Sequence, residues 1–188
     1  EAEKSRKTIV KTDWENIGIK ELAAIIARKL NEKGIDAILV GGACVSIYTK
    51  NKYLSIDLDF VSSASIKEIT PALAELGFER KSSRHFEREG CPFFIEFVSP
   101  PAAIGNEPVK VKATLRTKMG DIILLTATDS VKDRLAAYYH WNDPQALEQA
   151  LMIAKAQKIN LREVKRWSEK EGHKDKYNFF LKMRKRNK

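Results

Sequence analysis

The sequence predicts an α/β fold of the α+β type, in which a mixed β-sheet core flanked by helices is followed by a helical C-terminal region. Short alternating polar and apolar segments are interspersed with amphipathic patterns up to about residue 126, and only helical patterns follow. Helices and strands do not alternate regularly, which disfavours a doubly wound nucleotide-binding fold. We therefore expect a core over residues 1–126 and a helical region over 127–188, the alternative being one compact domain.

The elements of the core follow from periodicity and from the residues that interrupt it. Apolar residues at helical spacing indicate helices, strict alternation indicates strands, and glycine ends several segments. In chain order, the pattern first predicts a helix over 14–33 ended by Gly34, a buried strand over 37–40, and a helix over 43–48 that begins at a glycine pair. After a turn over 50–52, it predicts a strand over 55–61 and a helix over 66–76 capped by Gly77. The last strands of the core are expected over 92–98, closed by a proline pair, and over 109–116 and 121–127, joined by a turn.

Helix-capping signals organise the rest of the chain. Thr128-Asp129 is a typical N-cap, and Pro144 is placed as the first residue of a helix. The predicted helices cover 130–141, 144–157, 161–171 and 177–185.

Positive charge is concentrated at the C-terminus. The chain has 188 residues and a net charge of +9. Residues 174–188 contain seven basic residues and one acid, so this segment carries +6 and the other 173 residues carry +3. A basic tail of this kind fits a polyanion such as RNA, including tRNA, whereas the alternative is a solvated terminus.

Composition excludes several classes of protein. Cys44 and Cys91 are isolated, as are the three histidines, which disfavours a structural zinc site and a disulfide scaffold. The longest nearly apolar run, residues 37–48, is too short to span a bilayer, and the first residues lack the apolar stretch of a signal peptide. We therefore expect a cytoplasmic protein with no membrane partner; the oligomeric state is left open.

Three features combine into a candidate catalytic site. A strand runs into Gly41-Gly42, and Asp57 and Asp59 follow on one face of a later strand. Residues at i and i+2 of a strand share one face and have Cα atoms roughly 6–7 Å apart, so both carboxylates can reach one Mg²⁺ ion. The glycines allow a close approach of phosphates to the backbone, and the helix that follows contributes free N–H groups.

Glu96 is the third candidate ligand. Its neighbours in the strand 92–98 are almost all apolar, so its charge requires a partner or a metal ion. Each feature alone has a simpler explanation, because an Asp-x-Asp often lies on a solvated strand and a Gly-Gly is often only a turn. Their order and spacing together favour the functional interpretation.

The run Leu39-Val40-Gly41-Gly42 followed by Ser55-Ile56-Asp57-Leu58-Asp59-Phe60 resembles the signature of DNA polymerase β-like nucleotidyltransferases. A weaker resemblance extends to the AbiEii-type and minimal nucleotidyltransferases. The resemblance to these nucleotidyltransferases implies that three acids, Asp57, Asp59 and Glu96, are catalytic and bind Mg²⁺ (or Mn²⁺). It also implies that an NTP is bound by Gly41, Gly42, Ser55 and Lys132. Lys132 occupies the place of a nucleotide-binding lysine on a helix after the core.

Two departures from the family patterns bear on which nucleotidyltransferase activity is expected. The nucleotide-selecting motif of tRNA-terminal nucleotidyltransferases is not evident, and the stretch 143–149 lacks the acids of the later AbiEii-type motif. The resemblance therefore implies transfer of an NMP from an NTP to an unknown acceptor: an RNA end, a protein or a small molecule. The alternative is a non-catalytic nucleic-acid- or partner-binding module on a degenerate scaffold, for example in a toxin–antitoxin-type system.

Overall fold

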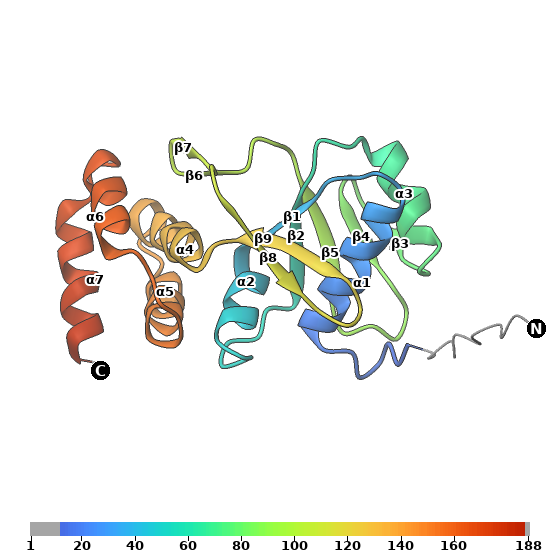
Figure 1. The fold of residues 1–188 in the computed structure, drawn as a ribbon, viewed down its shortest axis with the longest axis horizontal. Helices are drawn as coiled ribbons and strands as arrows, with labels where there is room; N and C mark the ends of the chain where they lie inside the picture. Colours follow the sequence, from blue (N-terminus) through green and yellow to red (C-terminus); the bar gives the residue numbers. More distant parts are fainter. Residues whose placement is uncertain (1–11, 187–188) are drawn as a thin grey trace, which may run out of the picture.

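A seven-stranded mixed sheet forms the centre of the computed structural model, which describes residues 12–186 (Figure 1). A separate hairpin, β6 (Ala103–Ile104) and β7 (Glu107–Pro108), projects beyond it. The expectations about residues 1–11 and about Lys188 fall outside the described residues. Across the sheet the strands are β3 (Glu79–Arg80), β4 (His85–Glu87), β5 (Phe94–Val98), β2 (Asp57–Val61), β1 (Ile38–Val40), β9 (Asp121–Leu125) and β8 (Lys112–Arg116).

Helices cover one face of this sheet and also extend from one end of it (Figure 1). The helices are α1 (Ile19–Glu32), α2 (Gly41–Tyr48), α3 (Ile66–Ala74), α4 (Ala127–Trp141), α5 (Pro144–Ala156), α6 (Leu161–Lys170) and α7 (Lys174–Arg186). The first three pack on the sheet, and α4 to α7 form a bundle beside α2. This arrangement confirms the predicted α/β class with a helical C-terminal region.

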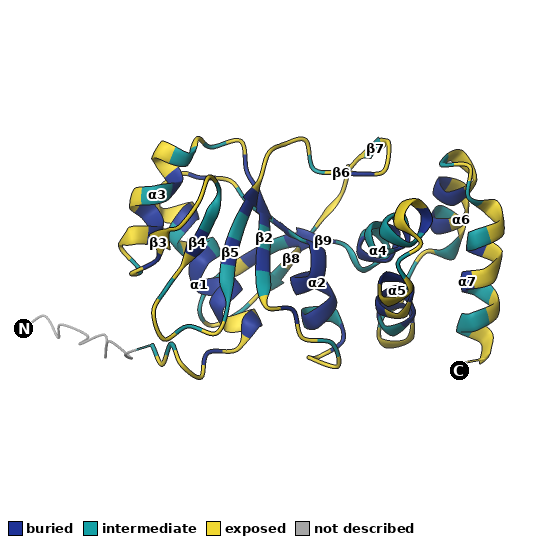
Figure 2. Ribbon diagram, turned by 180° about the vertical axis from the view of Figure 1, so that it is seen from behind, coloured by how far each residue is buried: buried dark blue, intermediate teal, exposed yellow. Residues whose placement is uncertain are grey.

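Two apolar clusters hold the structure together. One lies between the sheet and α1–α3 and contains Leu58 and Phe60; the other fills the bundle around Trp167 and Phe180. Figure 2 shows the buried residues concentrated in these two regions. Tyr48 and Val109 pack against both clusters, so the sheet and the bundle share a contact. The division of the chain into two domains stays a prediction.

The register of the sheet decides which side chains share a face. β2 pairs parallel with β5 and antiparallel with β1, while β1 pairs parallel with β9. Leu58 and Phe60 are buried towards the helices, as the alternation predicts. The intervening residues of β2, Asp57 and Asp59, therefore point to the opposite face, which we call the open face. In Figure 2, strands β4, β5 and β2 lie in front of α1, so this view shows the open face.

The structure shifts three helix starts by three residues or more, those of α1, α4 and α7. α7 begins at Lys174 rather than at Tyr177. α1 begins at Ile19 rather than at Trp14, because Gly18 has an extended backbone and Trp14 packs edge-on against Phe78. α4 begins at Ala127 rather than at Ser130, because the hydroxyl of Thr126 accepts a hydrogen bond from the N–H of Asp129 at 3.0 Å. Strands β3, β4, β6 and β7, each of two or three residues, were not predicted, because such lengths carry no readable periodicity.

Candidate active site

The three acids lie next to one another on the open face. Asp59 of β2 is the direct register partner of Glu96 in the parallel strand β5. Asp57 is two residues from Asp59 on the same strand and is paired in register with Phe94. Neighbouring strands are about 4.8 Å apart, so the three acids are neighbours on one face of the sheet.

Gly41 is required because Asp59 lies directly against it. Gly41 has a φ of +67°, and a Cβ at this position would lie 2.5 Å from Oδ2 of Asp59. A side chain would therefore collide with the carboxylate and would also strain the backbone. The Asp59 carboxylate consequently rests at the first turn of α2.

Gly42 makes room for Ser55 in the same way. A Cβ on Gly42 would lie 2.6 Å from the Oγ of Ser55. The Ser55 hydroxyl donates a 2.6 Å hydrogen bond to Oδ1 of Asp57, and its backbone N–H donates to the Oγ of Ser46 at 2.9 Å. Ser55 thus fixes the orientation of Asp57, and the glycine pair seats the acid-bearing strand as well as leaving the backbone accessible.

Asp59 is poised to change its charge near neutral pH. Burial raises the pKa of Asp59 to about 7, and the nearby charges of Asp57 and Glu96 add to the effect. The positive charge of Arg134, on α4, acts in the opposite direction. Buried like charges disfavour ionisation, so this group attracts either a proton or a metal cation.

Glu96 has a protein partner that the sequence did not reveal. Its Oε1 is 3.0 Å from Nδ1 of His85, and the other ring nitrogen of His85 is 2.7 Å from Oε1 of Glu87. The hydrogen bonds to Glu96 and then to Glu87 raise the pKa of His85. The ring of Phe94 lies 4.6 Å from the imidazole. His85 therefore holds one oxygen of Glu96 and leaves the other without a hydrogen bond among the described residues.

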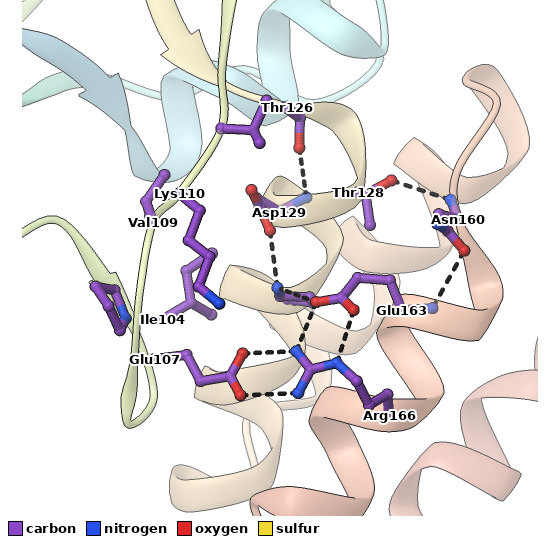
Figure 3. Close-up of a pocket in the computed structure, with 13 residues that line it drawn as sticks. Ile104, Glu107, Val109, Lys110, Thr126, Thr128, Asp129, Asn160, Glu163 and Arg166 are labelled. Atoms are coloured by element: carbon purple, nitrogen blue, oxygen red, sulfur yellow. Dashed lines mark hydrogen bonds and ion pairs between the residues drawn. The ribbon is translucent and has the colours of Figure 1, made fainter.

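Lys132 lines a cavity between the β6–β7 hairpin, α4 and α6 (Figure 3). The cavity has a volume of about 380 Å³. Inside it, the Lys132 ammonium pairs with Asp129 at 2.9 Å and with Glu163 at 3.1 Å. Arg166 links Glu163 to Glu107 of the hairpin. Lys132 is thus already neutralised by two carboxylates.

Arg134 is the basic residue of α4 whose charge influences Asp59. Residues two apart on a helix differ by about 200° in direction, so Lys132 and Arg134 point to different sides of α4. The Arg134 guanidinium donates to Asp133 and, at 3.3 Å, to Gln149. Its positive charge favours the ionised form of Asp59 and so opposes the rise of that pKa.

The comparisons with known proteins bear on the fold. No protein-family model matches the sequence, and no curated protein matches it. The chain is similar to the crystal structure of an antigenic nucleotidyltransferase-like protein from Paracoccidioides brasiliensis, with 16% identity, coverage of 72% of this chain and 74% of that chain, and a TM-score of 0.55. The chain has a nucleotidyltransferase-like fold. This result agrees with the resemblance of residues 39–60 to DNA polymerase β-like nucleotidyltransferases.

Two further solved structures resemble this nucleotidyltransferase-like chain less well. ANT(2")-Ia in complex with adenylyl-2"-tobramycin shares 10% identity over 85% of this chain and 96% of that chain, with a TM-score of 0.49. A tRNA-processing enzyme shares 17% identity over 82% of this chain and 48% of that chain, with a TM-score of 0.40. At these TM-scores neither carries an argument about this chain.

The acids fit a hard metal cation in their chemistry. Among residues 12–186, no three His, Cys, Asp or Glu side chains converge into a ready-made metal cluster. Asp57 and Glu96 each direct one oxygen to a protein partner, while Asp59 is half-buried and surrounded by negative charge. An oxygen donor set of this kind suits Mg²⁺ or Mn²⁺, provided that Asp57 and Glu96 turn their second oxygens towards the ion.

The basic C-terminal segment is a helix packed on the bundle. Tyr177 and Phe180 of α7 are buried, and the Lys176 ammonium donates to the carbonyl of Tyr139 and to the side chain of Asn142, both at 2.6 Å. Lys176 therefore caps the end of α4. None of the described helices has the length and apolar character needed to cross a membrane.

Proposed function

We propose that the protein is a metal-dependent nucleotidyltransferase that transfers an NMP from an NTP to an acceptor. The observation that carries this proposal is the position of Asp59, which lies against Gly41 and beside Glu96 and has its pKa raised to about 7. Such a carboxylate group stores unfavourable charge that a divalent cation would relieve. The nucleotidyltransferase-like fold supports the same activity.

Each residue has a role in this proposal. Asp57 and Asp59 would hold Mg²⁺ (or Mn²⁺), which supplies charge neutralisation for the triphosphate when bound. Glu96 would complete the ligand set and accept the proton of the acceptor hydroxyl. The acceptor oxygen forms a bond to the α-phosphorus while the bond to the bridging oxygen breaks, and pyrophosphate leaves with that electron pair.

The backbone and α4 would bind the phosphates. Gly41 and Gly42 open the first turn of α2, whose N–H groups favour anions, and Ser55 keeps Asp57 in place. We assign neutralisation of the phosphates to Arg134, since its charge already acts on Asp59. Lys132 would contribute only after leaving Asp129 and Glu163.

Calorimetric titration tests the proposal. ATP, CTP, GTP and UTP are titrated with and without Mg²⁺ into the wild type and the D57A/D59A variant. The proposal expects nucleotide binding that requires both the ion and the two acids. Arg134→Ala should weaken this binding more than Lys132→Ala, with unfolding curves to correct for lost stability. A well-folded wild type that binds none of the four nucleotides would refute the enzyme.

A second candidate function is a non-catalytic nucleic-acid- or partner-binding module. It is favoured by the protein contacts that already occupy Asp57 and Glu96, and by the exposed basic residues of α7, including Lys182 and Lys185. This candidate expects RNA binding that weakens with salt and persists in D57A/D59A.

A further inference from the structure

Lys112 and Arg116 of β8 form a basic stripe on the open face, which also carries the acids. In β9, Leu125 pairs with Lys112 of β8 and Asp121 pairs with Arg116. Leu124 is the register partner of the buried Leu39, so its neighbour Leu125 faces the opposite side of the sheet. Lys112, Thr114 and Arg116 consequently point to the face that carries Asp57, Asp59 and Glu96.

The cations of this stripe have no protein partner in the part of the chain that the structure describes. Lys112 and Arg116 are exposed and make no ion pair or side-chain hydrogen bond within residues 12–186. Lys110 and Lys118, which flank the strand, are also exposed and unpaired in the same range. Many other cations do have partners, such as Lys29 with Glu75. Unpaired cations in a row are the electrostatic signature of a surface that receives an anion.

A hollow lies beside the stripe. A cavity of about 610 Å³ is lined by Lys112 and Thr114 and by the apolar side chains of Ile38 and Ile123, and it extends to Ala27, Arg28 and Asn31 of α1. Asp36 and Asp121 also line it. Three strand spacings separate β8 from β2, so Lys112 is roughly 14 Å from Asp59. A polymeric ligand bound to Lys112 would therefore reach the carboxylates within a few monomer units.

We propose that the open face binds single-stranded nucleic acid, with its phosphodiester groups on Lys112 and Arg116. The apolar floor of Ile38 and Ile123 accommodates an unstacked base beside these phosphates, a combination that a single strand offers and a paired duplex does not. The bound strand would present its terminal hydroxyl to the carboxylates. Only this last role, as the acceptor of transfer, rests on the proposed function.

The competing explanation is protection of a sheet edge. β8 is an edge strand, and lysines on edge strands prevent pairing with other chains. Edge protection predicts aggregation in variants that lose the stripe, with nucleic-acid affinity unchanged. The two explanations therefore differ in a measurable way.

The test is fluorescence anisotropy with a labelled unstructured RNA 12-mer, without nucleotide or divalent cation. Each phosphate contact to a single strand adds about 0.7 to the salt slope, so K112A/R116A should lower the slope by about 1.4 and the affinity about 25-fold at 0.1 M salt. The matched control K20A/K67A removes two exposed cations from α1 and α3 and should change affinity less than twofold.

Other variants separate the possible outcomes. An equal loss in K112A/R116A and K20A/K67A, or a loss only in K182A/K185A of α7, would overturn the proposal. Displacement of the labelled RNA by polyglutamate as readily as by unlabelled RNA would also overturn it. So would an unchanged RNA affinity of K112A/R116A together with aggregation of that variant. RNA binding that persists without NTP binding would refute the proposed function and leave the surface supported.

Discussion

Replacing Gly41 by alanine would test whether the glycine pair seats the catalytic acids. Gly41 has a φ of +67°, and a Cβ would lie 2.5 Å from Oδ2 of Asp59. An alanine in the left-handed region costs roughly 1–2 kcal/mol, and forcing the Asp59 side chain off its rotamer costs roughly 0.5–1.5 kcal/mol more. The expected loss of unfolding free energy is therefore about 1.5–3.5 kcal/mol.

Gly34 provides a matched control for this variant. Its φ is +70°, yet nothing lies within 4 Å of the position that a Cβ would occupy. Gly34→Ala should lose only the backbone contribution of roughly 1–2 kcal/mol. The reduced entropy of the unfolded chain affects both variants alike, so it cancels in the comparison.

Urea unfolding and Mg²⁺-dependent NTP binding would be measured for both variants. Gly41→Ala should be the less stable of the two, with nucleotide binding impaired, whereas Gly34→Ala should bind nucleotide like the wild type. Equal stability of the two variants together with unimpaired nucleotide binding in Gly41→Ala would refute the reasoning. In that case the glycine would serve only the backbone conformation, and the carboxylate would adjust freely.

Three further predictions concern charged groups. Burial raises the pKa of Asp59 to about 7, so the metal-free wild type should lose stability as the pH rises from about 4 through 7. Thermal melts of Asp59→Asn should show no such loss. Hydrogen bonds from Arg166 and then Lys170 lower the pKa of Glu107 to about 2, so the stabilisation is present above about pH 4.5 and is lost as the pH falls towards 2; Glu107→Gln should flatten acid unfolding over this window. His85→Ala should weaken Mn²⁺ binding, followed by electron paramagnetic resonance, about 10- to 100-fold, because Glu96 loses its orienting partner; unchanged affinity would show that Glu96 is not a ligand.

The acid-bearing strand was predictable because its information is local. Alternation alone assigns Asp57 and Asp59 to one face and Leu58 and Phe60 to the other, and the structure has this arrangement. The helical C-terminal region was equally readable from apolar spacing and caps, to within a few residues at each end.

The partners of the site residues depend on contacts that are distant in the sequence. Glu96 finds His85 only because the three-residue strand β4 pairs with β5. Lys132 is neutralised by Glu163, 31 residues away on another helix. Neither contact leaves a periodic signal, so the sequence could identify Glu96 as needing a partner without naming it, and could select Lys132 from its helix without its orientation.

The charge balance of the open face connects these observations. Asp57, Asp59 and Glu96 bring three acids together, and the two cationic side chains near them are shared: His85 with Glu87, and Arg134 with Asp133. Burial raises the pKa of Asp59 to about 7, and the charges of Asp57 and Glu96, which these shared cations compensate only in part, add to the effect. In the absence of an ion, a proton on Asp59 removes one of the three negative charges, and a divalent cation would displace that proton.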